Sequence, residues 1–334
     1  MLLLDSLKGK NIPRFPVWLM RQAGRYMPQY RSLREKERDF LSFCKKVDLA
    51  VRASLLPIEL LDVDAVIIFS DILVPLEPMG VEVRFEEGEG PKLSWDGRVD
   101  SLKNISFSQV EFVGEIIKGV KNQVKEVPVI GFCGAPFTLM AYMLEGGSSK
   151  SYKNTKLFMW SKREDYKRLM ALLVENLLEY LKGQIRAGAD LLQVFDSWAM
   201  YLSYEDFEEY AQSYLKLLFE ELKKFSSVPL IYFFRGPSDF LKALEGLSVD
   251  AFSVDWTVDM VHAMRKSEKA FQGNLDPTVL YAEEEVIVKR AIDFLRCIPR
   301  RSKYIFNLGH GLMPDMDLKK VKLLVDTVKS YRLL

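Results

Sequence analysis

Short runs of apolar, β-prone residues recur along the chain, and each run ends abruptly in polar or turn-forming residues. Continuous apolar runs of this length are typical of strands that are buried on both faces, as in parallel sheets. The run at Lys269–Phe271 is the weakest of these signals. We predict eight strands, at Val17–Met20, Ala65–Phe69, Pro128–Phe132, Leu191–Phe195, Pro229–Phe234, Asp250–Val254, Lys269–Phe271 and Tyr304–Phe306.

Between the predicted strands, apolar residues recur with the period of an α-helix. The clearest stripes lie within residues 112–124, 169–180, 207–222 and 318–328. A strand followed by a helix, about eight times over, favours an α/β fold of the (β/α)8 TIM-barrel type. A doubly wound open sheet is the alternative, because strand number alone does not prove that a sheet closes.

The predicted units differ in length, so we expect a distorted barrel. Residues 85–95 contain two glycines and a proline and are expected to form an inserted hairpin or lid after the second strand. We find no internal repeat and no linker rich in Pro, Gly or Ser, which favours a single domain over residues 1–334.

Composition narrows the class of protein. The 47 Lys and Arg residues are balanced by 46 Asp and Glu residues, so no global field attracts nucleic acid or an acidic membrane. The three cysteines, Cys44, Cys133 and Cys297, are far apart in the sequence, which favours a reducing compartment. The N-terminal apolar run ends at Asp5, too early for a signal peptide, and no run reaches the roughly 18 apolar residues of a membrane span. We expect a cytoplasmic protein.

Polar groups follow every predicted strand, at the end of a barrel where active sites lie. Charged, amide and imidazole side chains gather in these segments. Strand ends are polar in many proteins, but the combination at eight ends favours a functional site. The segments are Arg21–Arg25, Ser70–Asp71, Cys133–Pro136, Asp196–Trp198, Arg235–Gly236, Asp255–Trp256, Gln272–Pro277 and Asn307–Gly311.

Two arginines and one acid stand out among these groups. Arg21 and Arg25 flank Gly24, and a guanidinium binds a carboxylate through paired, planar hydrogen bonds. Asp71 lies between two apolar runs, where a carboxylate is costly unless it is paired, hydrogen-bonded or neutralised. It is either a helix cap or buried ion-pair partner, or a carboxylate that faces cationic or N–H groups of a ligand.

Other polar candidates are more ambiguous. His310 lies between two glycines and is either a turn residue or a site residue. Tyr142 falls in an apolar helical pattern, where most tyrosines are core residues. His262, in a similar pattern, is expected to be a packing residue. Ser197 follows an acid, but no G-x-S-x-G motif supports a hydrolase nucleophile.

Motifs for several other chemistries are missing from the sequence. Residues 145–151 resemble a phosphate-binding loop but lack the G-x-x-x-x-G-K-[ST] spacing. No G-x-G-x-x-G follows a predicted strand, and no His/Cys cluster has the spacing of metal ligands. The remaining groups suit an anionic organic substrate that reacts by proton transfer.

Five sequence blocks carry a family resemblance. The block at residues 16–28, PVWLMRQAGRYMP, closely resembles the N-terminal signature of the uroporphyrinogen decarboxylase family. The other blocks follow in the family's order, so the resemblance covers nearly the whole chain. They lie at residues 68–73, 131–139, 272–277 and 307–311.

The resemblance implies a distorted (β/α)8 barrel, often a homodimer, that uses no cofactor. The lack of a metal-ligand cluster in the sequence separately leads us to expect no metal. This family removes CO2 from the four acetate side chains of uroporphyrinogen III and leaves coproporphyrinogen III, in haem biosynthesis. The resemblance assigns catalysis to Asp71 and Arg21. It assigns substrate binding to Arg21, Gln22, Ala23, Gly24, Arg25, Asp71, Tyr142, Ser197 and His310.

Two other functions stay open. Barrels of the same broad family transfer methyl groups and typically use a zinc site with His and Cys ligands, but this sequence contains no His-x-Cys. A tetrapyrrole-binding protein without catalysis is the other alternative. Release of CO2 would separate this binding protein from an enzyme. The identity of the proton donor, among Arg21, Tyr142 and His310, is not determined by the sequence.

Overall fold

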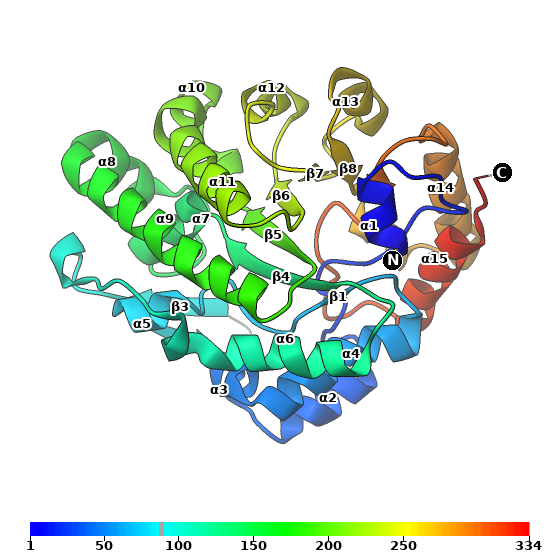
Figure 1. Cartoon of the computed structure of the whole chain (residues 1–334), viewed down its shortest axis with the longest axis horizontal. Coiled ribbons are helices and arrows are strands. Elements are labelled where there is room, and N and C mark those ends of the chain that lie inside the picture. Colours follow the sequence, from blue (N-terminus) through cyan, green and yellow to red (C-terminus); the bar gives the residue numbers. More distant parts are fainter. Residues whose placement is uncertain (87–89, 334) are drawn as a thin grey trace.

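A computed structural model describes residues 1–86 and 90–333 of the chain. Its centre is a curled sheet of seven strands in the order β1-β4-β5-β6-β7-β8-β9 (Figure 1). All neighbouring pairs in this sheet are parallel. The strands are β1 (Val66–Ile67), β4 (Val129–Gly134), β5 (Leu191–Asp196), β6 (Leu230–Phe234), β7 (Ala251–Val254), β8 (Ala270–Gln272) and β9 (Tyr304–Ile305).

The segment around Val17 closes the sheet into a barrel. Val17 forms a parallel bridge with Phe306, just beyond β9. On its other side, the carbonyl oxygen of Val17 accepts a hydrogen bond from the backbone nitrogen of Asp64, 2.7 Å away and two residues before β1. The eight predicted segments therefore all take part in the barrel, although the first contributes a single bridge and not a full strand.

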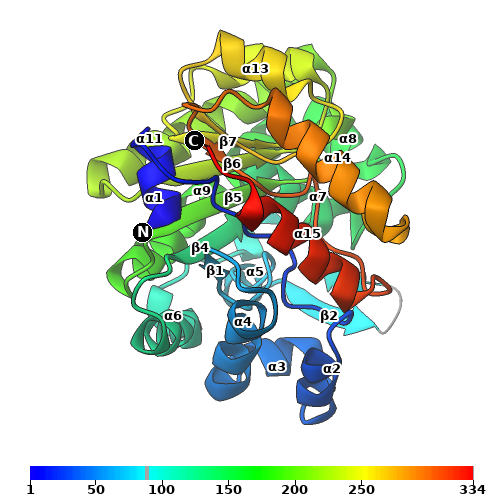
Figure 2. The same ribbon diagram turned by 90° about the vertical axis from the view of Figure 1, so that its right-hand side faces the viewer.

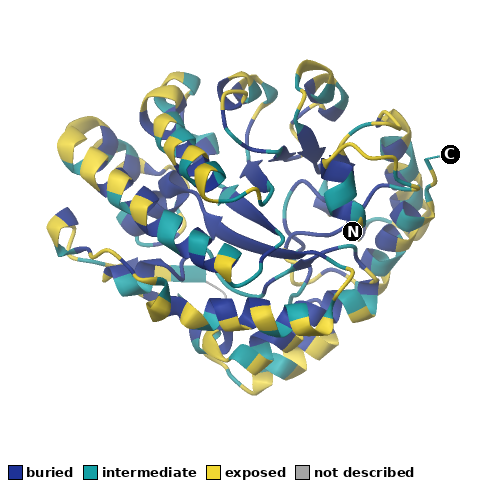
Figure 3. Cartoon of the chain, in the orientation of Figure 1, coloured by how far each residue is buried: buried dark blue, intermediate teal, exposed yellow. Residues whose placement is uncertain are grey.

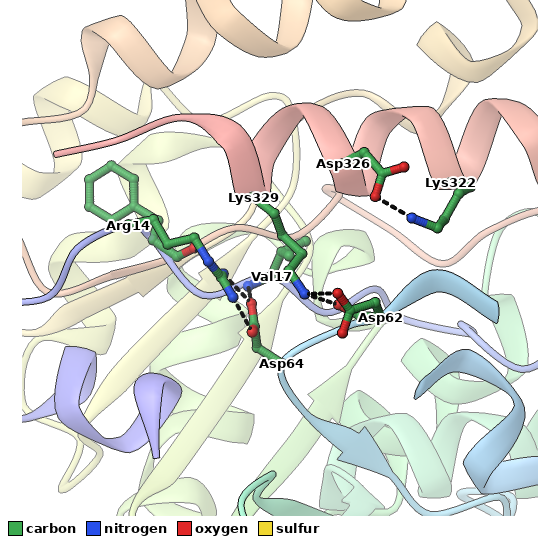
Figure 4. Close-up of polar contacts among 8 residues, drawn as sticks. Arg14, Val17, Asp62, Asp64, Lys322, Asp326 and Lys329 are labelled. Carbon is green, nitrogen blue, oxygen red and sulfur yellow. Dashed lines mark hydrogen bonds and ion pairs between the residues drawn. The ribbon is translucent and has the colours of Figure 1, made fainter. Parts of the chain in front are cut away.

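A side-chain clamp fixes this closure. The carboxylate of Asp64 accepts hydrogen bonds from the backbone nitrogen of Val17, at 2.8 Å, and from both terminal nitrogens of Arg14, at 2.6 and 2.7 Å (Figure 4). Beside it, Lys329 donates to the carbonyl oxygen of Asp62 at 2.7 Å. The clamp ties both ends of the chain to the loop before β1, because Arg14 and Lys329 are 315 positions apart (329 − 14).

Helices cover the outside of the barrel, as Figures 1 and 2 show. The longest, α9, has 24 residues. The helices are α1 (Leu2–Leu7), α2 (Pro28–Glu35), α3 (Phe40–Lys45), α4 (Val47–Leu61), α5 (Leu76–Met79), α6 (Glu111–Gln123), α7 (Pro136–Glu145), α8 (Lys153–Ser161), α9 (Arg163–Arg186), α10 (Tyr204–Asp206), α11 (Ser213–Phe225), α12 (Leu241–Leu244), α13 (Met260–Lys266), α14 (Glu284–Cys297) and α15 (Leu318–Ser330). Short 3-10 turns occur at Val99–Ser101, Phe107–Val110, Ala199–Tyr201, Ser238–Phe240 and Pro277–Tyr281. No helix in the described part of the chain is long and apolar enough to cross a membrane.

Local sequence signals explain several helix ends. Pro136 stands at the start of α7, where its missing N–H costs no helical hydrogen bond, and Gly146 ends that helix at φ 69°. The side chain of Asp259 caps α13 by accepting a hydrogen bond from the backbone nitrogen of His262 at 2.9 Å. Asp317 caps α15 in the same way.

Two sequence expectations on helices were inaccurate. His262 is exposed and is not the packing residue that we expected, because Met260 and Ala263 form the buried side of the short helix α13. The stripe at residues 207–222 is not one uniform helix: Phe207–Gln212 is π-helical and precedes α11. An apolar period alone does not resolve an inserted π turn.

An antiparallel pair lies outside the barrel sheet. It consists of β2 (Glu82–Glu86) and β3 (Gly90–Ser94). The predicted insertion at residues 85–95 overlaps this pair, but residues 87–89 lie outside the described residues.

The strands of the barrel sheet are mostly buried and the outward faces of the helices are exposed (Figure 3). The barrel interior also contains a buried polar chain. Trp18 Nε1 donates to Gln272 Oε1 at 2.9 Å, and Gln272 Nε2 donates to Gln193 Oε1 at 3.0 Å and to Ser253 Oγ at 2.9 Å. These bonds satisfy both side-chain groups of Gln272 and link four of the barrel segments across the interior.

Candidate active site

The loop after the first barrel segment, the bridge at Val17, carries Arg21. Its backbone has φ 59°, a left-handed conformation that is uncommon for a residue with a side chain. The flanking residue Met20 is held on both sides: its nitrogen donates to Asn307 Oδ1 at 3.1 Å, and its carbonyl oxygen accepts from Leu312 N at 3.0 Å. The loop after β9 therefore fixes the backbone from which the exposed side chain of Arg21 extends.

Three other predicted site residues lie within the electrostatic reach of Arg21. The charge of its guanidinium lowers the pKa of Asp71, of Tyr142 and of His310. These residues come from four different loops or helices around the same end of the barrel. The structure thus brings together residues that are up to 289 positions apart in the sequence (310 − 21).

Asp71 lies just after β1 in partly buried surroundings. Burial raises the pKa of its carboxyl group to about 6; a hydrogen bond from the backbone nitrogen of Leu73, at 2.9 Å, and the charge of Arg21 oppose this shift. Within residues 1–86 and 90–333, no salt bridge to Asp71 is found. The carboxylate therefore accepts one hydrogen bond within a local turn and can accept more. It is not a member of a buried ion pair among the described residues.

Tyr142 and His310 are both uncharged near neutral pH. Burial raises the pKa of Tyr142 to about 12, and the negative charge of Asp71 contributes in the same direction. Burial lowers the pKa of His310 to about 4, with further lowering by Arg21 and Arg235 and an opposing hydrogen bond with Gly311. Tyr142 extends from α7, and its ring meets Trp198 edge-on at 5.5 Å between centroids.

Ser197 follows β5, directly after the buried residue Asp196. The side chain of Asp196 accepts hydrogen bonds from Thr138 Oγ1 at 2.6 Å and from Tyr232 Oη at 2.7 Å. Thr138 Oγ1 in turn accepts from the backbone nitrogen of Trp198 at 3.2 Å. Burial raises the pKa of Asp196 to about 6. These contacts hold the turn that contains Ser197 at a fixed position on the barrel end.

The remaining loop residues have different surroundings. Gln22 is completely buried, and its side chain binds backbone: Nε2 donates to the carbonyl oxygen of Ala65 at 3.0 Å and Oε1 accepts from Leu19 N at 3.2 Å. Ala23 and Gly24 are half-buried, and Arg25 is exposed. The carbonyl oxygen of Arg25 accepts from Arg31 at 2.7 Å, which fixes the end of the loop.

The sequence search for site residues did not single out Asn307 or Thr138. Asn307 is fully buried and ties the loop of Arg21 to the loop of His310, while Thr138 joins Asp196 to the turn of Ser197. Both residues lie in the sequence blocks that carry the family resemblance, and their position just after a strand was the available signal. Their partners are distant in sequence and only the fold identifies them.

The arrangement suits one kind of chemistry. The carboxylate of Asp71 lies in poorly hydrated surroundings beside a cationic loop, where it can accept hydrogen bonds from N–H groups and stabilise a developing positive charge. Arg21 and Arg25 offer exposed guanidinium groups that suit carboxylates. In the described part of the chain, no group of three His, Cys, Asp or Glu side chains could hold a metal ion.

Comparison with known proteins agrees with this geometry. The profile of the uroporphyrinogen decarboxylase (URO-D) family matches residues 1–331. The chain belongs to the uroporphyrinogen decarboxylase family. It is 60% identical to the uroporphyrinogen decarboxylase of Aquifex aeolicus over 332 residues, which cover 99% of this chain and 98% of the relative. It is 47% identical to the enzyme of that name from Hydrogenobaculum sp., over 98% of this chain and 95% of the relative.

Membership of the uroporphyrinogen decarboxylase family also agrees with the fold. A solved methyltransferase from Methanosarcina mazei superposes with a TM-score of 0.82, covering 98% of this chain and 97% of its own length. Its sequence identity is 19%, so this likeness concerns the barrel and not the reaction. The predicted TIM-type barrel is confirmed.

Proposed function

We propose that this chain is a uroporphyrinogen decarboxylase that converts the four acetate side chains of uroporphyrinogen III into methyl groups, releasing CO2 and coproporphyrinogen III. The observation that carries the proposal is Asp71, a partly buried carboxylate without an ion-pair partner among the described residues, in a chain of this family. A carboxylate at this position could accept hydrogen bonds from the several pyrrole N–H groups that a tetrapyrrole macrocycle presents at its centre.

The substrate itself supplies the electron sink. Loss of CO2 leaves an electron pair, and a pyrrole ring that has been protonated on carbon can accept it. The ring is cationic before the C–C bond breaks, so a nearby carboxylate lowers the barrier. Ionised Asp71 would accept hydrogen bonds from the pyrrole N–H groups and stabilise that charge. A proton finally replaces CO2 on the side chain, which becomes a methyl group.

Arg21 is proposed to bind and position the reacting acetate. A guanidinium is a poor proton donor in water. We therefore propose that Arg21 orients the acetate and stabilises its charge, rather than donating the proton. Bringing an acetate close to Arg21 would also place negative charge near His310. That charge raises the pKa of the imidazole from about 4 towards a range where it can donate a proton. Tyr142 and Ser197 are proposed to orient carboxylates or ring groups.

The other loop residues have supporting roles in this proposal. Arg25 would bind a second carboxylate, and Ala23 and Gly24 would let the substrate approach the backbone closely. Gln22 would act by holding the loop, since its amide is committed to backbone partners. We further propose a single-domain, cofactor-independent enzyme that forms a homodimer in the cytoplasm.

Two measurements on one incubation test the proposed function. Uroporphyrinogen III is supplied under anaerobic conditions, and released CO2 and the number of carboxylates on each product are recorded. We expect products that carry fewer carboxylates, ending with coproporphyrinogen III, and unchanged activity after dialysis against a strong chelator. Binding without CO2 release would favour a tetrapyrrole-binding protein, and a chelator-sensitive activity restored by zinc would favour the methyltransferase alternative.

A further inference from the structure

Arg235 follows β6 at the barrel end that carries the site. Its guanidinium carbon lies 5.7 Å from the ring centroid of Trp256, a tryptophan that is 38% exposed. In the described part of the chain, no carboxylate forms a salt bridge with Arg235. The guanidinium is thus held over an aromatic face, but its charge has no anionic partner.

The backbone around Arg235 and Trp256 is firmly joined. Gly236 N donates to Asp255 Oδ2 at 3.2 Å, and Thr257 Oγ1 donates to the carbonyl oxygen of Gly236 at 3.1 Å. Asp255 also accepts from Thr257 N at 2.8 Å. These bonds connect the ends of β6 and β7, so the stacked pair sits on a fixed base.

The same pair adjoins the loop of His310. A Cβ atom built at Gly309 would lie 2.6 Å from Trp256 N and 2.9 Å from its ring atom Cε3, so this loop lies directly against the tryptophan. The His310 ring meets Phe233, two residues before Arg235, at 6.2 Å between centroids. The positive charge of Arg235 contributes to the lowered pKa of His310. Arg235 therefore faces the same mouth as Arg21 and His310.

We propose that Arg235, stacked on Trp256, binds a carboxylate of the substrate at the side of the site opposite the Arg21–Arg25 loop. A guanidinium held over an aromatic ring keeps N–H groups that can bind a carboxylate bidentately. The inference rests on the proposed function, because that substrate carries more carboxylates than the Arg21–Arg25 loop can pair. An organic carboxylate is thus the class of group that this position takes.

Electrostatics favour an anion here over a purely structural role. Arg21 and Arg235 both lower the pKa of His310, and the repulsion between two neighbouring cations is offset when an anion binds between them. An arginine that served only to cover Trp256 would need no free N–H edge. A carboxylate would relieve this repulsion and would raise the pKa of His310 when the substrate is present.

Steady-state kinetics with uroporphyrinogen III test this inference on three variants. Arg235→Met removes the cation and keeps an apolar stem over Trp256, and Arg235→Lys keeps the charge without the planar fork. Arg265→Met, at an exposed position on α13, is the control. Loss of a hydrogen bond to a charged group predicts a KM about ten- to a hundredfold higher for Arg235→Met, with kcat within about threefold of wild type. Arg235→Lys should show a smaller rise of KM, about threefold or more, and Arg265→Met should show none.

The outcomes separate the inference from the proposed function. A wild-type chain that releases no CO2 overturns both. An active wild type together with a folded Arg235→Met variant of unchanged KM overturns only the role of Arg235. Should Arg235→Met fail to fold, as judged by circular dichroism, Arg235→Lys decides: an unchanged KM contradicts the role of the planar fork.

Discussion

Gly311 lies directly against the side chain of Arg21: a Cβ atom built at Gly311 would be 2.5 Å from Arg21 Cδ and 2.6 Å from Cγ. The absence of a side chain at residue 311 therefore allows the arginine stem to pass over the loop of His310. Arg21 itself has φ 59°, and its neighbour Met20 is hydrogen-bonded on both sides. The direction of the guanidinium depends on a glycine 290 positions further along the chain (311 − 21).

Gly311→Ala should lower turnover without unfolding the protein. The added methyl group would collide with the flexible side-chain stem of Arg21 and not with backbone. The main effect is therefore a displaced guanidinium. A misplacement of about 1 Å in a reacting group can lower the rate about 10²-fold. We therefore expect kcat to fall by about tenfold to about 10²-fold.

The matched control is Gly246→Ala, where a Cβ atom would meet only the end of Lys216, at 3.4 Å. Kinetics and thermal unfolding are measured on both variants. Equal turnover of the two alanine variants would show that Gly311 does not set the position of Arg21.

Arg21→Lys should weaken catalysis while the fold is retained. Lysine keeps the positive charge but lacks the planar pair of donors that matches a carboxylate. Arg21 is exposed and forms no salt bridge to another described residue, so stability should change by less than about 0.5 kcal/mol, as for surface substitutions. Near wild-type values of kcat and KM for Arg21→Lys would contradict a role of Arg21 in substrate binding or catalysis.

The eight barrel segments could be predicted because the apolar runs are continuous and separated by helical patterns. Asp71 could also be predicted, because a carboxylate between apolar runs is unfavourable unless it is paired, hydrogen-bonded or neutralised. Side-chain direction was beyond such reasoning. Gln22 has a polar side chain in a site loop, yet its amide turns inward to Ala65 and Leu19.

Contacts between distant segments were also outside the reach of sequence patterns. The clamp between Arg14 and Asp64 closes the barrel, but neither residue differs in type from the many charged residues on the surface. Arg235 was visible as a strand-end cation, whereas its stacking on Trp256 required the register of β6 with β7. Such partners follow from topology, because each strand end is placed by its neighbours in the barrel.

The cysteines should be dispensable for turnover. Burial raises the pKa of the Cys44 and Cys133 thiols, so neither forms the reactive thiolate readily. Cys297 is exposed, on α14. A variant with all three replaced by serine should keep wild-type kcat if it stays folded, and a thiol reagent should label only Cys297 in the native protein. Complete loss of turnover in a folded triple variant would contradict this prediction.

Activity should fall in mild acid. The carboxylate of Asp71 must be ionised to stabilise a cationic ring, and burial raises its pKa to about 6. We therefore expect kcat/KM to fall by about tenfold per pH unit below about pH 6. The profile is measured with the substrate held well below KM. A flat profile down to pH 5 would show that ionised Asp71 is not required.

Asp71→Asn should stabilise the protein at high pH. The native pKa of about 6 lies above the unfolded value near 3.8, so the native state binds the proton more tightly. The stability due to that proton is present below about pH 4 and is lost as the pH rises through about 6. A neutral Asn keeps the acceptor for Leu73 N and avoids the buried charge, a gain of roughly 1–3 kcal/mol at pH 8 that disappears near pH 4.

The most direct test of the account combines turnover and thermal unfolding of Asp71→Asn at pH 7.5. We expect a variant at least as stable as wild type that has lost about 10²–10³ in kcat, the effect of removing one electrostatic stabiliser. Asp71→Glu, which keeps the charge but moves it by one methylene, should retain part of the activity. A loss of about 3–5 kcal/mol of stability would instead indicate a buried ion pair, and a stable Asp71→Asn protein with normal turnover would contradict the role of Asp71 in decarboxylation.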